Sequence, residues 1–212
     1  MKEKKYSNEI GVLVPEVMLP PQGTDMMKWA VVACDQFTSQ KEYWEEARRI
    51  IGDAPSTLDL ILPEAYLGSP DEPERIAAIK ANMKDYLQKG ILQKQPQGFV
   101  LVERVANGNT RHGLVMALDL EEYDYSKGSG TLIRATEGTI LERIPPRVKI
   151  RQGASLELSH VLLLMDDARG RVLDALEEKK AALPPVYDFS LMQGGGHIAG
   201  YAVSGADAAA FD

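Results

Sequence analysis

The chain has 212 residues, of which 44% are hydrophobic and 26% are charged. This composition is typical of a globular protein, and the length suffices for one large domain or two small ones with a buried core. The net charge of -7 disfavours nucleic acid or an anionic membrane as the main partner.

Cys34 is the only cysteine, which excludes an intramolecular disulfide and a zinc site built from cysteines. The first apolar run, residues 10–14, is interrupted by Pro15 and Glu16. It is too short for a signal peptide or a membrane span, and no later segment reaches membrane length. We therefore expect a cytoplasmic protein with no membrane partner.

Local patterns in the first hundred residues predict strands and two helices. Short apolar runs predict extended or buried strands at 11–14, 18–19, 29–34 and 58–62. A capping box of Ser39 and Glu42 predicts the start of a helix that ends at Gly52. Apolar residues at helical spacing over 76–87 predict a second helix, which Gly90 terminates.

The second half predicts two pairs of extended arms with a strand and a helix between them. The arms 99–105 and 114–120 flank Asn107-Gly108, a dipeptide typical of a tight hairpin. A polar loop covers 123–130, and Pro145-Pro146 argue against a regular helix throughout the charged segment that contains them. The last predicted elements are a buried strand at 161–165, a helix over 172–180, and arms 185–191 and 197–203.

Strands interspersed with helices and one clear antiparallel hairpin predict an α+β or mixed α/β fold, with a mixed sheet and three main helices. Residues 207–212 have the composition of a first helical turn, and a single turn is not stable alone. We therefore expect residues 1–212 to be a single N-terminal domain, or a portion of one, in a longer protein that has been truncated near residue 212.

The segment 134–151 concentrates positive charge in an acidic protein. Its cations are Arg134, Arg143, Arg147, Lys149 and Arg151. Guanidinium groups suit bidentate binding of phosphate or carboxylate, so the segment predicts an anion site to which Thr139 also belongs. Glu137 and Glu142 are candidate metal ligands or general bases. The alternative is a solvated loop of weak surface ion pairs.

Two other segments offer candidate site residues. Gly194, Gly195 and Gly196 followed by His197 can arrange backbone amides around an anion, although a long hairpin turn explains them better. Asp35 follows an apolar run and precedes a helix, a position from which a carboxylate can hold Mg²⁺ or a hydroxyl. The three histidines are far apart in sequence and lack zinc-binding spacing.

Several separated motifs together resemble domain-of-unknown-function family 1015 of bacteria and archaea. The segments that carry the resemblance are Trp29–Ser39, Tyr43–Trp44, Arg134–Thr139, Ile144–Arg147 and Tyr187–His197. Fuller members of that family are about twice this length and carry an Asp-Gly-His/Asn-His-type motif in their second half. By fold-level analogy, that motif is similar to the nucleotide-handling motif of the ParB, sulfiredoxin and free-serine-kinase superfamily. The motif does not occur in these 212 residues.

The resemblance implies binding of a nucleotide or another phosphorylated small molecule, in keeping with a serine-kinase-like phosphotransferase. Arg134, Arg143 and Arg147 would hold the anionic groups, and Asp35 and Glu137 would act as the catalytic carboxylates. The cofactor and metal stay undetermined, with ATP or ADP and Mg²⁺ as candidates. The first alternative is a non-catalytic, ParB-like regulatory module, and the second is a structural half completed by a missing C-terminal segment.

Overall fold

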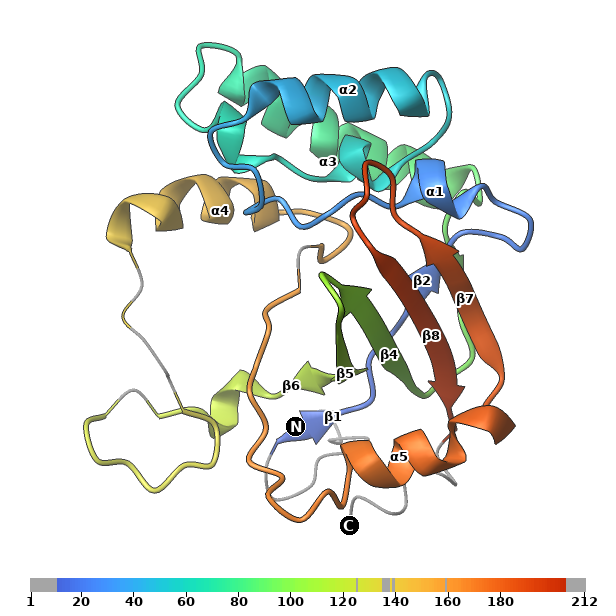
Figure 1. Ribbon diagram of the computed structural model, residues 1–212. Coiled ribbons are helices and arrows are strands. Elements are labelled where there is room, and N and C mark those ends of the chain that lie inside the picture. The colour runs from blue at the N-terminus through green and yellow to red at the C-terminus, as the bar shows by residue number, and fades with distance from the viewer. Residues whose placement is uncertain (1–10, 125, 135–137, 139, 159, 205–212) are drawn as a thin grey trace.

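The computed structural model describes residues 11–124, 126–134, 138, 140–158 and 160–204. Four α-helices gather at one end of the molecule, and a four-stranded sheet with a fifth helix forms the other end (Figure 1). The α-helices are α1 (Met26–Trp29), α2 (Lys41–Ile51), α3 (Glu72–Gln88), α4 (Ile144–Arg151) and α5 (Leu173–Lys179). Among the described residues, no helix has both the length and the apolar character needed to cross a membrane.

Helices α2 and α3 confirm the two helices predicted in the first half of the chain. Helix α3 buries Ile76, Ile79 and Met83 in a core that includes Trp29 and Leu60. A residue in the left-handed conformation follows each helix, as glycine allows: φ is 61° at Gly52 after α2 and 68° at Gly90 after α3. The C-terminal ends of both helices were therefore predicted correctly.

The capping box predicted for α2 is wrong. The residue that precedes the helix is Gln40, whose side chain makes no capping hydrogen bond. Ser39 lies one residue too early to cap, and Glu42 is only the second helical residue. The helix is held instead by the burial of Trp44, Ala47 and Ile51.

The apolar runs 29–34 and 58–62 are not strands. Trp29 ends α1, and a 3₁₀ helix, η1, covers Thr57–Leu60. The hydroxyl groups of Ser56 and Thr57 each donate to the Trp29 carbonyl oxygen over 3.0 Å, and the amide of Val31 donates to Thr57 Oγ1 over 3.2 Å. Side chains therefore satisfy backbone groups that a neighbouring strand would otherwise satisfy.

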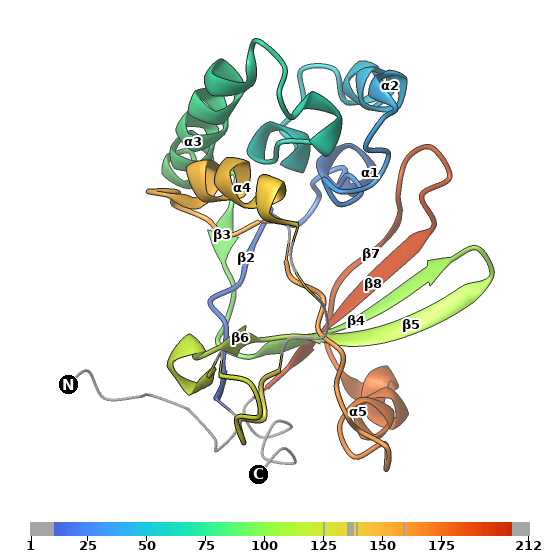
Figure 2. The same cartoon turned by 90° about the vertical axis from the view of Figure 1, so that its left-hand side faces the viewer.

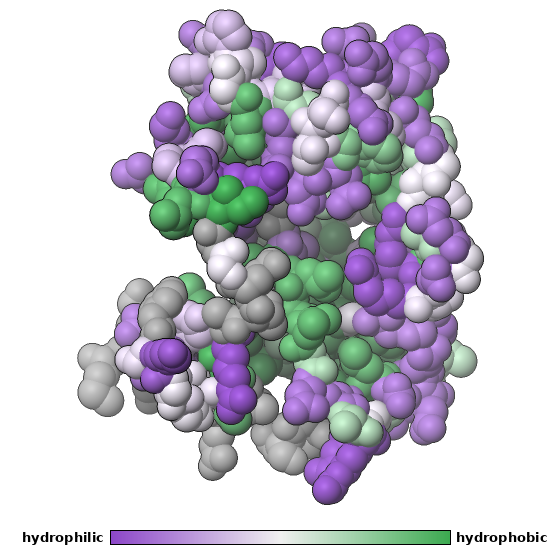
Figure 3. Space-filling view, turned by 60° about the vertical axis from the view of Figure 1, so that its left-hand side comes forward, coloured by the Kyte–Doolittle hydropathy of each residue, from purple (hydrophilic) through white to green (hydrophobic). Residues whose placement is uncertain are grey.

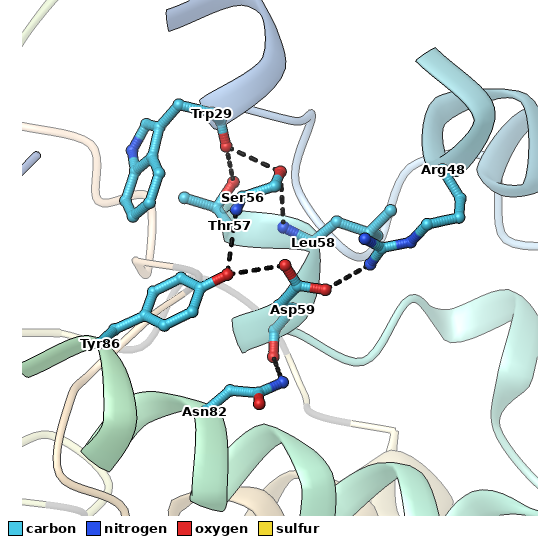
Figure 4. A network of polar contacts seen from close by, with 8 residues as sticks. All are labelled: Trp29, Arg48, Ser56, Thr57, Leu58, Asp59, Asn82 and Tyr86. Atoms are coloured by element: carbon cyan, nitrogen blue, oxygen red, sulfur yellow. Dashed lines mark hydrogen bonds and ion pairs between the residues drawn. The ribbon is translucent and has the colours of Figure 1, made fainter. Parts of the chain in front are cut away.

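A network of polar contacts connects these elements (Figure 4). The Tyr86 hydroxyl on α3 accepts from the Ser56 amide over 3.1 Å and donates to Asp59 Oδ2 over 2.7 Å. Asp59 also forms an ion pair with Arg48 of α2, and its carbonyl accepts from Asn82 over 3.1 Å. Burial, followed by the bond to Asp59, raises the pKa of Tyr86 to about 12.

The main sheet has the strand order β5-β4-β8-β7. Its strands are β4 (Phe99–Ala106), β5 (Asn109–Val115), β7 (Pro185–Ser190) and β8 (His197–Val203). The positive φ angles of Asn107 (51°) and Gly108 (76°) form the tight turn between β4 and β5, so the hairpin is confirmed, but its second strand spans Asn109–Val115 and not the predicted 114–120. The arms around the triple glycine are confirmed as β7 and β8.

Two short ladders complete the strands. They are β1 (Val12–Leu13) with β6 (Ala117–Leu118), and β2 (Met18–Leu19) with β3 (Gln93–Lys94). Every described strand pair is antiparallel, whereas a mixed sheet was expected. A tight turn joins β4 to β5 and a longer hairpin turn joins β7 to β8, and both turns reverse the chain direction. The α+β class itself is confirmed.

Helix α5 lies beside the sheet at the end remote from α2 (Figures 1 and 2). It is followed by a 3₁₀ turn, η5 (Lys180–Ala182), as expected of a helix that ends before Pro184. Leu176 and Leu183 are buried against Phe99 and Leu101 of β4. This contact is a second core, separate from that of α1 and α3.

The predicted buried strand at 161–165 is wrong on both counts. These residues form no regular secondary structure. All five side chains are exposed, from 42% for Met165 to 84% for Leu164. Further large apolar side chains are exposed in the segment before them: Leu120, Leu132, Ile140, Leu141, Ile144 and Val148. An apolar run shows that burial is favourable, but it does not provide the covering partner.

Candidate functional site

Two of the predicted phosphate-binding arginines converge on one carboxylate. Arg147 Nη2 lies 2.6 Å from Glu64 Oε1, and Arg143 Nη1 lies 3.5 Å from Glu64 Oε2. Glu64 opens a 3₁₀ helix, η2 (Glu64–Tyr66), and its side chain is only 6% exposed. The two arginine side chains are 46–47% exposed, so solvent and ligands can still reach them.

Local sequence explains why the arginines act together. Pro145 and Pro146 occupy the first turn of α4, where proline is tolerated because the first amides of a helix have no acceptor within it. Arg143 and Arg147 are four residues apart at this helix start and thus lie on one side. The 3₁₀ turn before α4 is η4 (Leu141–Arg143).

Helix α4 is fixed against α3, as Figure 2 shows. Lys149 Nζ lies 3.7 Å from Glu72 Oε1, and Lys80 Nζ donates to the Gln152 carbonyl over 2.8 Å. The Glu72 side chain is nearly buried, and its other oxygen, Oε2, accepts from the Gly68 amide over 2.7 Å. These contacts hold the arginines near η2.

Two more cations lie at η2. The guanidinium of Arg75 lies 4.0 Å from the centre of the Tyr66 ring, and Lys41 Nζ lies 5.7 Å from it. Such contacts are favourable because the ring face is electron-rich. Helices α2 and α3 therefore each add a cation beside η2, of which Arg75 also pairs with Asp71 at 2.7 Å. The site is a short turn bordered by cations from three helices.

The exposed side of α4 is hollowed. An open hollow of about 510 Å³ is lined by Ile144, Arg147, Val148, Arg151 and Gln152. A second, of about 320 Å³, is lined by Glu72, Pro73, Ile76, Lys80, Lys149 and Gln152. Figure 3 shows apolar side chains gathered over this hollowed face of the molecule. The larger hollow thus combines two guanidinium groups with two apolar side chains.

The loop that contains Asp35 lies next to η2 because its preceding residue, Cys34, contacts Glu64. The Glu64 amide donates to the Cys34 carbonyl over 2.8 Å, so the loop that contains Asp35 lies against η2. Asp35 itself is exposed. The structure therefore brings together the chain segments of Asp35, Arg143 and Arg147, with Glu64 between them.

Of the other predicted site residues in the charged segment, Arg134 does not join this group. Arg134 Nε donates to the Thr131 carbonyl over 3.1 Å within its own loop, which Figure 1 shows away from α4. Glu137 and Thr139 lie outside the described residues. Glu142 is exposed in η4, beside Arg143.

The triple glycine lies at the β7–β8 turn. It interacts with a guanidinium group through a carbonyl oxygen. The guanidinium of Arg104 on β4 donates to the carbonyl oxygens of Gly195 and His197. At Gly196, φ is 88°, and a β-carbon would lie 2.3 Å from the Val105 carbonyl oxygen. The His197 ring pairs with Asp188 at 2.8 Å. The turn that contains these glycines contacts β4 through Arg104 and α2 through Gln193, while Arg143 and Arg147 contact η2.

Glu64, Tyr66, Lys41 and Arg75 were missed by sequence reasoning. Glu64 and Arg147 are far apart in the chain, and no local periodicity connects them. The only local signal is a carboxylate directly after Pro63, where an apolar run ends. A group of three described residues of metal-ligating type lies elsewhere, on the main sheet and on α5.

A protein-family model described as "Protein of unknown function (DUF1015)" matches residues 18–210. The match covers η2, α4 and the triple glycine alike. No curated protein and no solved structure matches the chain.

Proposed function

The chain belongs to the DUF1015 family, whose function is unknown, and we propose that it binds a nucleotide or another phosphorylated small molecule in the hollow along α4. The observation that carries this proposal is the convergence of Arg143 and Arg147 beside that hollow. A fork of N–H donors matches the oxygens of a phosphate group. Location in the cytoplasm, where such metabolites occur, is part of the same proposal.

The lining of the hollow supports a ligand with both charged and apolar parts. Arg147 and Arg151 lie one helical turn apart, as do Ile144 and Val148. Phosphate oxygens would bind the first pair, and a base or another planar group would cover the second. Glu64 competes for Arg147, and Glu157, 2.6 Å from Arg151, competes for the second guanidinium group, so a dianionic phosphate is a better ligand than a single carboxylate.

A phosphoryl-transfer activity, as in the serine-kinase-like proteins, is the catalytic form of this proposal. Such reactions depend mainly on positioning and charge stabilisation. Asp35, on the loop against η2, is the carboxylate that would orient a hydroxyl group or bind Mg²⁺ with ATP or ADP. Glu137 is the second candidate. Ligand binding without turnover would instead favour the regulatory, ParB-like alternative.

Calorimetric titration with ATP, ADP and inorganic phosphate tests the proposal. Arg147→Gln should weaken binding of the tightest of these ligands about tenfold or more, since a charge-assisted pair is lost. Lys94→Gln is the matched control, because Lys94 pairs with Glu16 on the surface in a strand outside the hollow. Equal affinities of the two variants, or no binding of any of the three ligands, would overturn the proposal.

A second candidate function rests on the exposed apolar segment 161–165. Five consecutive exposed apolar residues without a strand partner are typical of an interaction surface. We propose as its occupant a C-terminal segment of the same polypeptide, which would make this chain a structural half.

Hydrogen exchange tests this second candidate. The amides of 161–165 should become protected when the chain is produced together with the polypeptide that follows it in the full-length protein. Leu162→Ser combined with Leu164→Ser should remove that protection and reduce self-association of the chain alone. Unchanged exchange in the presence of the additional polypeptide would reject this occupant.

A further inference from the structure

A second cluster of polar side chains lies between α5 and the main sheet, apart from η2 and α4. Its members are Glu103 on β4, His112 on β5 and Glu177 on α5. His112 Nε2 lies 3.1 Å from Glu103 Oε2, and its Nδ1 lies 2.9 Å from Glu177 Oε2. One ligand atom from each residue lies within 4.8 Å of the other two.

Regular secondary structure positions all three side chains. Glu103 and His112 are directly opposite each other in the antiparallel ladder, so they lie on the same face of the sheet. Glu177 follows Leu176, which is 3% exposed and packs against the sheet core. Groups on packed strands and helices keep their geometry better than groups on loops. The cluster is therefore preformed.

The cluster is sheltered but open on one side. The side chains of Glu103 and His112 are each 19% exposed, and that of Glu177 is 41% exposed. Partial shelter strengthens charge interactions because less water screens them. The exposed side at Glu177 leaves an entry for a small cation.

We propose that Glu103, His112 and Glu177 form a binding site for a divalent transition-metal ion such as Zn²⁺ or Co²⁺. Imidazole nitrogen and carboxylate oxygen are ligands that these ions accept. The two ring nitrogens point in different directions, so the ion binds one of them. The carboxylate at the other nitrogen accepts its N–H and fixes the ring, as is common for metal-binding histidines. Water completes the coordination.

Lys180 is a built-in competitor of the metal ion. Its ammonium group pairs with Glu103 Oε2, the oxygen that also lies nearest to His112. It neutralises Glu103 in the absence of metal, and an entering ion must displace it. Removing this charge with Lys180→Met should therefore tighten metal binding.

The histidine spacing in the sequence does not predict a metal site, because its ligands come from two strands and a helix. Only the β4–β5 register and the docking of α5 bring them together. The proposal does not depend on the anion site, since none of its residues lines the hollows along α4.

Titration of the full chain with Co²⁺, followed by its visible d–d absorption, tests the site directly. A band should appear that Zn²⁺ abolishes by competition. His112→Ala should remove the band, whereas His160→Ala, which changes an exposed histidine elsewhere, should keep it. Glu177→Gln should weaken binding about 10- to 100-fold, as the loss of a supporting carboxylate does in other metal sites.

Glu177→Gln also covers the case in which His112→Ala fails to fold, since it alters a half-exposed side chain and keeps its size. The absence of a Co²⁺ band in the unmodified chain would overturn the proposal. So would equal affinity of the unmodified chain and Glu177→Gln.

Discussion

The helical core around α3 and the segment from Leu120 to Met165 differ in where their apolar side chains lie. Around α3, Trp29, Leu60 and Met83 are each no more than 5% exposed. Among the described residues of the second region, eleven large apolar side chains are at least 38% exposed. Each region contains a short apolar run, 58–62 in the first and 161–165 in the second, and only the first contains buried residues, so hydrophobicity alone does not determine burial. The availability of a packing partner does.

The largest expected difference in stability is between two leucine-to-alanine substitutions, one in each region. Leu60→Ala should lower the free energy of unfolding by about 3–5 kcal/mol, because it leaves a cavity in a closed core. Leu164, at 84% exposure, has few contacts to lose, so Leu164→Ala should change it by less than about 0.5 kcal/mol. Urea unfolding measures both values. Equal losses would show that 161–165 is covered in solution.

The polar network around Tyr86 should contribute less to the free energy of unfolding than the apolar core around α3 does. Tyr86→Phe removes a partner from both the Ser56 amide and Asp59. A loss of about 1–3 kcal/mol in the free energy of unfolding is expected, since buried polar groups are left without a hydrogen bond.

Tyr86→Phe should also change how the stability of the protein depends on pH. Folding raises the pKa of Tyr86 from 10.0 to about 12, so the unfolded chain loses this proton first as the pH rises. The stability that Tyr86 provides is thus present below pH 10 and is lost between pH 10 and about 12. Burial also raises the pKa of Tyr187 to about 12. Difference titration of tyrosinate absorbance against Tyr86→Phe therefore isolates Tyr86, and identical titration curves would contradict the assignment.

A smaller loss of stability than that of Leu60→Ala or Tyr86→Phe is expected where the two regions meet, at Glu64. Glu64→Gln should cost about 1–2 kcal/mol, less than a fully buried ion pair, because both arginines are half-exposed. The variant should bind phosphate more tightly than the unmodified chain, since Arg143 and Arg147 lose a competing carboxylate. Weaker phosphate binding by calorimetry would show that Glu64 orients the arginines instead of competing with a ligand.

The sequence-based predictions were accurate where the signal is local and wrong where the structure depends on a distant packing partner. Helices α2 and α3 and the Asn107-Gly108 hairpin were predictable because their signals are local. The runs 58–62 and 161–165 were both misassigned, for different reasons. Leu60, Ile61 and Leu62 are buried as expected, but side chains satisfy the surrounding backbone groups. The 161–165 segment has no covering element within the described residues.

The candidate site was predictable only in part. The arginines of α4 stood out because they are concentrated in an acidic chain. Glu64 could not be found in the same way, since its role depends on the packing of α4 across α3. Likewise, the Glu103–His112–Glu177 cluster depends on strand register and on how α5 docks.

The turn between β7 and β8 has a mechanical consequence. Arg104 holds it from the neighbouring strand, and Gln193 Nε2 in the same turn donates to the Tyr43 carbonyl of α2 over 3.2 Å. The turn is therefore tied on one side to the main sheet and on the other side to the helical end of the molecule. Replacing Arg104 by lysine, whose single ammonium cannot span these carbonyl groups, would loosen the turn from β4 while the contact with α2 stays.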